Sequence, residues 1–233
     1  MVEVPDEIIV CMEEVSLKVT ADSIVNYIAV STVKLDGARV EEGFQASKLM
    51  LYTIEPGQTK LKAVYSDVHK MTITCLSHYK GYLAAVTNTK TRDRLVVFYK
   101  FDGVKMDPKV QPQSNQNLAI SISFDGDLIF LGDAYKNIRV LYLEDPEILK
   151  IHEKVDDPEK FISIKRLCSN KMNQKVVGVH TLRSAERNDY ARLSKAEKQA
   201  LALFSASESG YLRIYGLREK KLLECLAQVN IQD

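Results

Sequence analysis

The fold is decided by the stretch Gly126-Asp-Leu-Ile-Phe-Leu-Gly-Asp-Ala-Tyr-Lys-Asn-Ile-Arg-Val-Leu-Tyr-Leu143. It contains two short apolar runs, Leu128–Leu131 and Ile138–Leu143, rich in residues that fit the pleated surface of a sheet. Between the runs lies the polar segment Gly132–Asn137, whose aspartate and asparagine can hydrogen-bond to nearby backbone as turn residues do. Two such strands joined by a polar turn predict a β-hairpin.

The same hairpin pattern recurs at three other places in the chain. In each, an apolar strand that ends in small or polar residues is followed by a strand that carries a tyrosine. The pairs are Tyr27–Thr32 with Lys48–Ile54, Tyr82–Thr87 with Arg94–Tyr99, and Leu201–Ala206 with Tyr211–Tyr215. Self-similarity over intervals of this length is typical of a repeat protein.

Apolar segments, several of them alternating, flank each hairpin and complete a four-stranded unit. The expected opening strands are Ile8–Met12 with Val15–Val19, Ile73–Leu76, Leu118–Phe124 and Phe161–Leu167. The expected closing strands are Leu61–Tyr65, Val104–Val110, Ile148–Val155 and Leu222–Val229. Pro108 makes the second closing strand an edge strand, because proline cannot donate to a ladder. Val176–Val179 fits either an extra strand or part of the last opening strand.

Four-stranded units repeated about four times predict an all-β fold of WD40-like β-propeller blades. Propellers typically close with about 4–8 blades, so four units are enough for a small closed ring. The alternative, which we favour, is one partial propeller domain over residues 1–233 that forms a segment of a larger propeller. Its open edges would be templates for self-association or for pairing with other chains.

Two insertions interrupt the repeat. Residues 34–46 interrupt the first hairpin, and residues 183–200 interrupt the last unit with a charged segment of helical character. Within the second insertion, Ser194-Lys-Ala-Glu197 fits a capping box, in which serine and glutamate satisfy each other's backbone N–H groups. Apolar residues are few there, so we expect any helix to be exposed or to dock on a partner.

Composition is that of a globular protein with a packed core, since 45% of the residues are hydrophobic and 27% are charged. The formal net charge of +1 argues against a dedicated nucleic-acid arm or membrane-binding surface. No apolar run has the length of roughly 20 residues that crosses a bilayer. The acidic start lacks the basic region of a signal peptide, so we expect a nuclear or cytosolic protein.

Cysteine usage agrees with a reducing compartment. Cys11, Cys75, Cys168 and Cys225 are scattered one per unit, each within an apolar run, and they form no C-x-x-C pair. We therefore expect buried free thiols rather than disulfides.

The sequence contains no pattern of catalytic, metal-binding or cofactor-binding residues. No two of the four histidines are three or four residues apart, and no cysteine stands at ligand spacing to any of them. Asp125-Gly126-Asp127 lacks the downstream ligands of an EF-hand and fits a hairpin turn. Nucleophile elbows, phosphate-binding loops and dinucleotide fingerprints are absent. We expect no enzyme activity, no metal and no cofactor.

The candidate contact residues are four basic residues of the second insertion. They are Arg183, Arg187, Arg192 and Lys195. Basic side chains at this density can contact phosphates or a partner protein. Three acidic residues are interleaved with them, so the alternative is an ordinary solvated surface.

The linear order of these motifs resembles the CPSF A family of large multi-propeller scaffolds. That family includes the large subunit of the cleavage and polyadenylation specificity factor, the damaged-DNA-binding adaptor of cullin ubiquitin ligases, and a propeller subunit of a splicing factor. The family-wide resemblance is carried by Gly126–Tyr142 and Lys80–Ala84. Val10–Leu17 and Glu55–Gln58 are most similar to the polyadenylation factor.

The resemblance implies a non-catalytic segment of a seven-bladed C-terminal propeller, in a nuclear scaffold that holds other subunits of the pre-mRNA 3′-end processing complex. Two alternatives stay open: a ubiquitin-ligase adaptor or splicing scaffold of the same family, and a module that binds RNA or DNA directly. The insertion at residues 171–199 departs from the family pattern, so no binding residue is carried over from the family.

Overall fold

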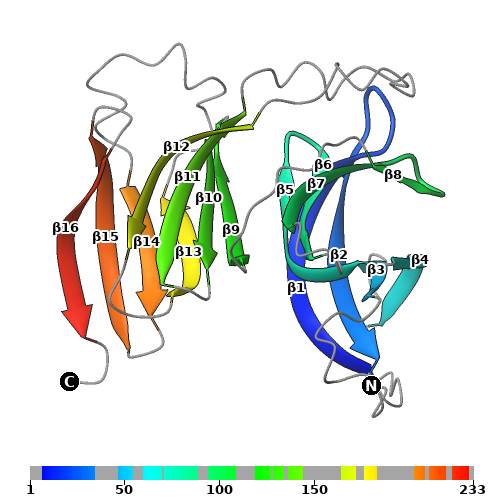
Figure 1. The fold of residues 1–233 in the computed structure, drawn as a ribbon. Helices are drawn as coiled ribbons and strands as arrows, with labels where there is room; N and C mark the ends of the chain where they lie inside the picture. The colour runs from blue at the N-terminus through cyan, green and yellow to red at the C-terminus, as the bar shows by residue number, and fades with distance from the viewer. Residues whose placement is uncertain are drawn as a thin grey trace. The chain divides into compact units, whose positions relative to one another are not determined.

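The computed structural model describes residues 7–34, 47–54, 60–69, 71–88, 94–108, 119–126, 128–133, 136–143, 164–171, 176–182, 202–207, 210–218 and 222–230. These residues form four antiparallel sheets of four strands each, with no helix among them (Figure 1). The predicted all-β fold of four blade-like units, typical of a partial β-propeller, is confirmed. The chain divides into two compact units, Met1–Gln116 and Asn117–Asp233, each with two of the sheets.

Unit 1 contains the first and second sheets. The first sheet consists of β1 (Glu7–Lys18), β2 (Ile24–Lys34), β3 (Ser47–Ile54) and β4 (Leu61–His69), and the second of β5 (Thr72–Tyr79), β6 (Tyr82–Asn88), β7 (Arg94–Phe101) and β8 (Met106–Pro108). Strands adjacent in sequence are paired throughout, so each sheet is a meander. One buried cluster joins the two sheets and includes Val15, Leu17 and Leu51 from the first sheet with Leu83 and Tyr99 from the second.

Unit 2 contains the third and fourth sheets. The third consists of β9 (Ala119–Asp125), β10 (Leu128–Asp133), β11 (Asn137–Leu143) and β12 (Ile164–Lys171), and the fourth of β13 (Val176–Leu182), β14 (Ala202–Ser207), β15 (Tyr211–Arg218) and β16 (Leu222–Asn230). Within this unit β13 packs against β9 and β10. Gly132 on β10 allows this approach, because a Cβ atom there would lie 2.8 Å from side-chain carbons of both Val176 and Val179.

A β-bulge at one position of the opening strand shows that the four sheets are copies of one design. In each sheet, one residue of the opening strand has no partner on the second strand. The residue just before it on the opening strand pairs with a small polar residue near the end of the second strand. The bulged residues are Val10, Thr74, Ile120 and Val177, and the neighbouring polar residues are Thr32, Thr87, Asp133 and Ser207. The bulge therefore gives a common register in which positions of the four sheets can be equated.

Serine hydroxyls connect the sheets near these bulges. In unit 1, the Ser47 Oγ accepts a hydrogen bond of 2.8 Å from the Ile73 N–H, and the Ser31 Oγ donates one of 3.4 Å to the Ile73 carbonyl. In unit 2, the Ser121 Oγ accepts a hydrogen bond of 2.8 Å from the Val179 N–H. Hydroxyls of one sheet thus satisfy buried peptide groups on the opening strand of the next, which otherwise would be costly to bury.

Two of the predicted strand boundaries are wrong. Ile8–Met12 and Val15–Val19 were expected as separate segments, but Glu7–Lys18 is one strand of 12 residues. No turn former separates the segments, and the bulge at Val10 absorbs the change in alternation without ending the strand. The exposed pair Glu13 and Glu14 continues the ladder opposite Ala29 and Ile28.

The boundary between the third and fourth units also differs from the prediction. Phe161–Leu167 was expected to open the fourth unit, but Ile164–Lys171 is β12 and closes the third sheet by pairing with β11. The fourth sheet opens with β13, so Val176–Val179 belongs to its opening strand. The predicted closing strand Ile148–Val155 lies outside the described residues. An alternating pattern predicts that a segment is a strand, but it does not predict which other strand it pairs with.

Other predictions for the third unit are confirmed. The side chains of Ile129, Leu131, Ile138 and Val140 are buried, as expected for the core of the hairpin. Asp125 lies opposite Leu128 across the turn, and Gly126 has a positive φ of 55°, which confirms the Asp-Gly hairpin turn. Pro108 ends the edge strand β8, also as predicted.

Candidate functional site

The basic residues that the sequence singles out cannot be placed. Arg183, Arg187, Arg192 and Lys195, together with the whole insertion at 183–200, lie outside the described residues. Their role in contacting a partner or nucleic acid stays a prediction. The described residues offer two other features with the density of polar or apolar groups expected of a site: a polar cluster on the β10–β11 hairpin and a groove on the first sheet.

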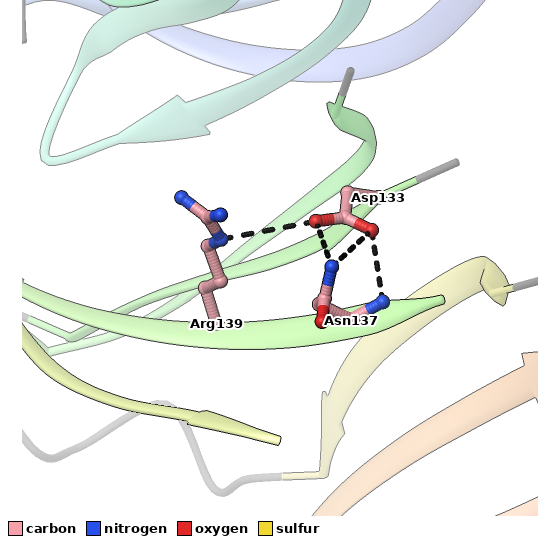
Figure 2. Close-up of polar contacts among 3 residues, drawn as sticks. All are labelled: Asp133, Asn137 and Arg139. Atoms are coloured by element: carbon pink, nitrogen blue, oxygen red, sulfur yellow. Dashed lines mark hydrogen bonds and ion pairs between the residues drawn. The ribbon is translucent and has the colours of Figure 1, made fainter. Parts of the chain in front are cut away.

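The polar cluster is built around the carboxylate of Asp133, which is almost fully buried at the end of β10. Its Oδ1 accepts hydrogen bonds from the backbone N–H of Asn137 at 2.8 Å and from the Asn137 Nδ2 at 3.1 Å. Its Oδ2 accepts a further bond from Nδ2 at 2.9 Å and lies 3.8 Å from the Arg139 Nε. Figure 2 shows the asparagine and the arginine converging on this carboxylate from β11.

The arrangement around Asp133 fixes a turn. The Asp133 carbonyl also accepts a hydrogen bond of 3.3 Å from the Lys136 N–H, and Lys136 has a positive φ of 69°. A residue other than glycine adopts this left-handed conformation only where its surroundings enforce it. The carboxylate oxygens are occupied by donors of the same hairpin, so we interpret the cluster as structural. The stretch Gly126–Tyr142, which carries the family-wide resemblance, therefore has a structural role in this hairpin.

Among the residues that the structure describes, no group of three or more histidine, cysteine, aspartate or glutamate side chains is placed to hold a metal ion. In the same part of the chain there is no helix long and apolar enough to span a bilayer.

The groove lies over β1, β2 and β3 on the face of the first sheet that is turned away from the second sheet. It has a volume of about 440 Å³ and is lined by Met12, Glu13, Glu14, Asn26, Tyr27, Ile28, Tyr52 and Ile54. The register explains how these residues meet, because Glu14 lies opposite Ile28, and Ile28 lies opposite Tyr52 on the next strand. Met12 and Ile54 are 63% and 57% exposed at its margins.

Several lining residues carry polar groups, among them the carboxylates of Glu13 and Glu14. The Tyr52 hydroxyl donates a hydrogen bond of 3.2 Å to the Met50 Sδ, and the Ser16 Oγ donates one of 2.8 Å to the Asn26 Oδ1. The walls are mainly apolar and the floor is the sheet itself. Exposed apolar surface that is concave and continuous over three strands is typical of a binding surface. The groove has the shape and the apolar surface to bury side chains that pack on it.

The thiols of the two unit 1 cysteines have raised pKa values, whereas Cys225 of unit 2 is exposed to solvent. Burial raises the pKa of the Cys11 thiol to about 12 and raises that of the buried Cys75 thiol further. Both therefore stay protonated near neutral pH. Cys75 is buried as predicted, whereas Cys11 is only partly buried. Cys225 is exposed on β16, so the prediction of burial is wrong there. Cys225 comes directly before the bulge at Leu226, which separates its pairing with Tyr215 from the pairing of Ala227 with Ile214, and a simple alternation does not anticipate this bulge.

His69 is the one histidine whose burial has a clear electrostatic consequence among the described residues. Its ring meets the Tyr99 ring edge-on, with the centroids 5.5 Å apart, at the contact between the two sheets of unit 1. Burial lowers the pKa of the imidazole below its ordinary value, only partly offset by the nearby Asp67. The protonated form is therefore disfavoured in the folded protein.

Sequence reasoning missed the groove. Its residues are spread over three strands, and in the sequence Ile28 and Tyr52 are recognisable only as members of a hairpin. The internal repeat was the one signal that could have revealed the groove, because the equivalent positions of the second sheet pack against the first sheet. That equivalence needed the positions of the bulges, which the sequence does not reveal.

A family model described as the CPSF A subunit region matches residues 4–178, well over half of the chain. The matched range includes the first, second and third sheets and the beginning of β13. No curated protein sequence matches the chain.

Proposed function

The chain belongs to the CPSF A family of propeller scaffolds, and from that premise we propose that it is a non-catalytic scaffold segment of the nuclear machinery that cleaves and polyadenylates pre-mRNA. The family match over residues 4–178 is the observation that carries the proposal. Members of the family act in mRNA processing or related machinery. The repeated four-stranded sheets support a protein whose surfaces, rather than a catalytic centre, carry the function.

The choice of the polyadenylation machinery within the family rests on two short stretches, Val10–Leu17 and Glu55–Gln58. The first of these lies on β1 and includes Met12 and Glu14, two residues that line the groove. We expect partner proteins of the 3′-end processing complex to contact the scaffold through such exposed surfaces.

The experiment is a tagged purification of the intact protein from its own cells, with the bound partners identified by mass spectrometry. Recovery of a 3′-processing endonuclease and poly(A) polymerase would support the proposal. Recovery of a cullin, or of spliceosomal proteins without 3′-processing factors, would assign the chain to another branch of the family and sink the polyadenylation proposal.

Direct binding of nucleic acid is the second candidate function, motivated by the basic residues of the insertion. Changing Arg183, Arg187 and Arg192 together to glutamate should weaken RNA binding and flatten its dependence on salt, because each lost phosphate contact lowers the number of released counterions. The matched control changes Lys18, Lys34 and Lys60, which are exposed in unit 1, to glutamate. An unchanged salt slope in the arginine variant would exclude this function for the insertion.

A further inference from the structure

We draw no further inference here: the strongest candidate, the seam of unit 1 where Asp67 on β4 and Asp107 on β8 interact electrostatically with the Tyr65 hydroxyl, is an acidic cluster to which no second observation in the described part of the chain assigns a ligand.

Discussion

Tyr52 on the first sheet and Tyr99 on the second lie at the same position of the repeat, each opposite an aliphatic residue of the preceding strand. Tyr99 is 2% exposed and packs on His69 of the adjacent sheet, whereas Tyr52 lies in an open groove. The difference arises from the neighbours of the two sheets, because the strands and their pairing are alike. The same position of the repeat is therefore buried between two sheets in one copy and lines an open groove in the other.

Ile129 tests the assignment of the central hairpin. The side chain is fully buried on β10, so Ile129→Asp should destabilise unit 2 by about 4 kcal/mol or more, because the charge would have no compensating partner. Chemical denaturation followed by circular dichroism measures the loss. Ile24→Asp is the control, since Ile24 is 67% exposed and should tolerate the same change. Equal stability of the two variants would contradict the hairpin assignment.

Gly132 tests the packing of β13 on β10. An added Cβ atom would lie 2.8 Å from carbons of Val176 and Val179, so Gly132→Ala should cost about 1–3 kcal/mol through overpacking. Gly178→Ala is a matched control within the same unit, because a Cβ atom there would meet Ala206 at an ordinary distance of 3.9 Å. The control should change the free energy of unfolding by less than about 1 kcal/mol. A double change, Gly132→Ala with Val176→Ala, should recover part of the loss.

His69 gives unit 1 a predictable dependence on pH. Because burial lowers its pKa in the folded state, the unfolded chain binds the proton more readily. The stabilisation from neutral His69 is complete above the unfolded pKa of about 6.5 and is lost as the pH falls through the lower pKa of the folded state. We expect the urea midpoint to drop between pH 7.5 and pH 5, and His69→Phe to reduce this drop.

The control for this measurement is His78→Phe, which changes an exposed side chain. It should leave the difference between the two urea midpoints as in the wild type. If His69→Phe and His78→Phe had the same effect, the pH dependence would have to come from groups other than His69.

The thiols should react in an order set by their burial. Iodoacetamide at neutral pH should modify Cys225 in the folded protein and should modify Cys11 and Cys75 only after denaturation, because their raised pKa values and burial keep the thiolate population very small. Peptide mass spectrometry distinguishes the sites. Rapid labelling of Cys75 without loss of structure would show that β5 is not packed on the first sheet.

The sequence predicts the local features of the fold well and the long-range ones less well. The hairpin between Leu128 and Leu143 is signalled by apolar runs and a polar turn that are adjacent in the chain, and it forms as predicted. The strand Ile164–Lys171 is recognisable as a strand, yet its pairing with β11 spans the chain between residues 143 and 164. Alternation is the same whichever partner a strand has, so the sequence alone assigns it to the wrong unit.

The groove shows the same limit at the level of function. Ile28 and Leu83 have similar side chains in similar contexts, and no property of either residue tells whether another sheet covers it. The exposure of these side chains depends on which other sheet packs against the hairpin, and that sheet is formed by residues far away in the sequence. The basic insertion stands out in the sequence because charge density is a local property, and its role stays a prediction.

The polar cluster of the third sheet has a consequence for the order of folding. The contacts described above join Asp133 to residues at most six positions away, Lys136, Asn137 and Arg139, so little chain entropy is lost when they form. Contacts between sheets, such as Ser121 with Val179, span 58 residues and must close far longer loops. We therefore expect the β10–β11 hairpin to be formed early in the transition state, where it would serve as a template on which β9 and β12 assemble.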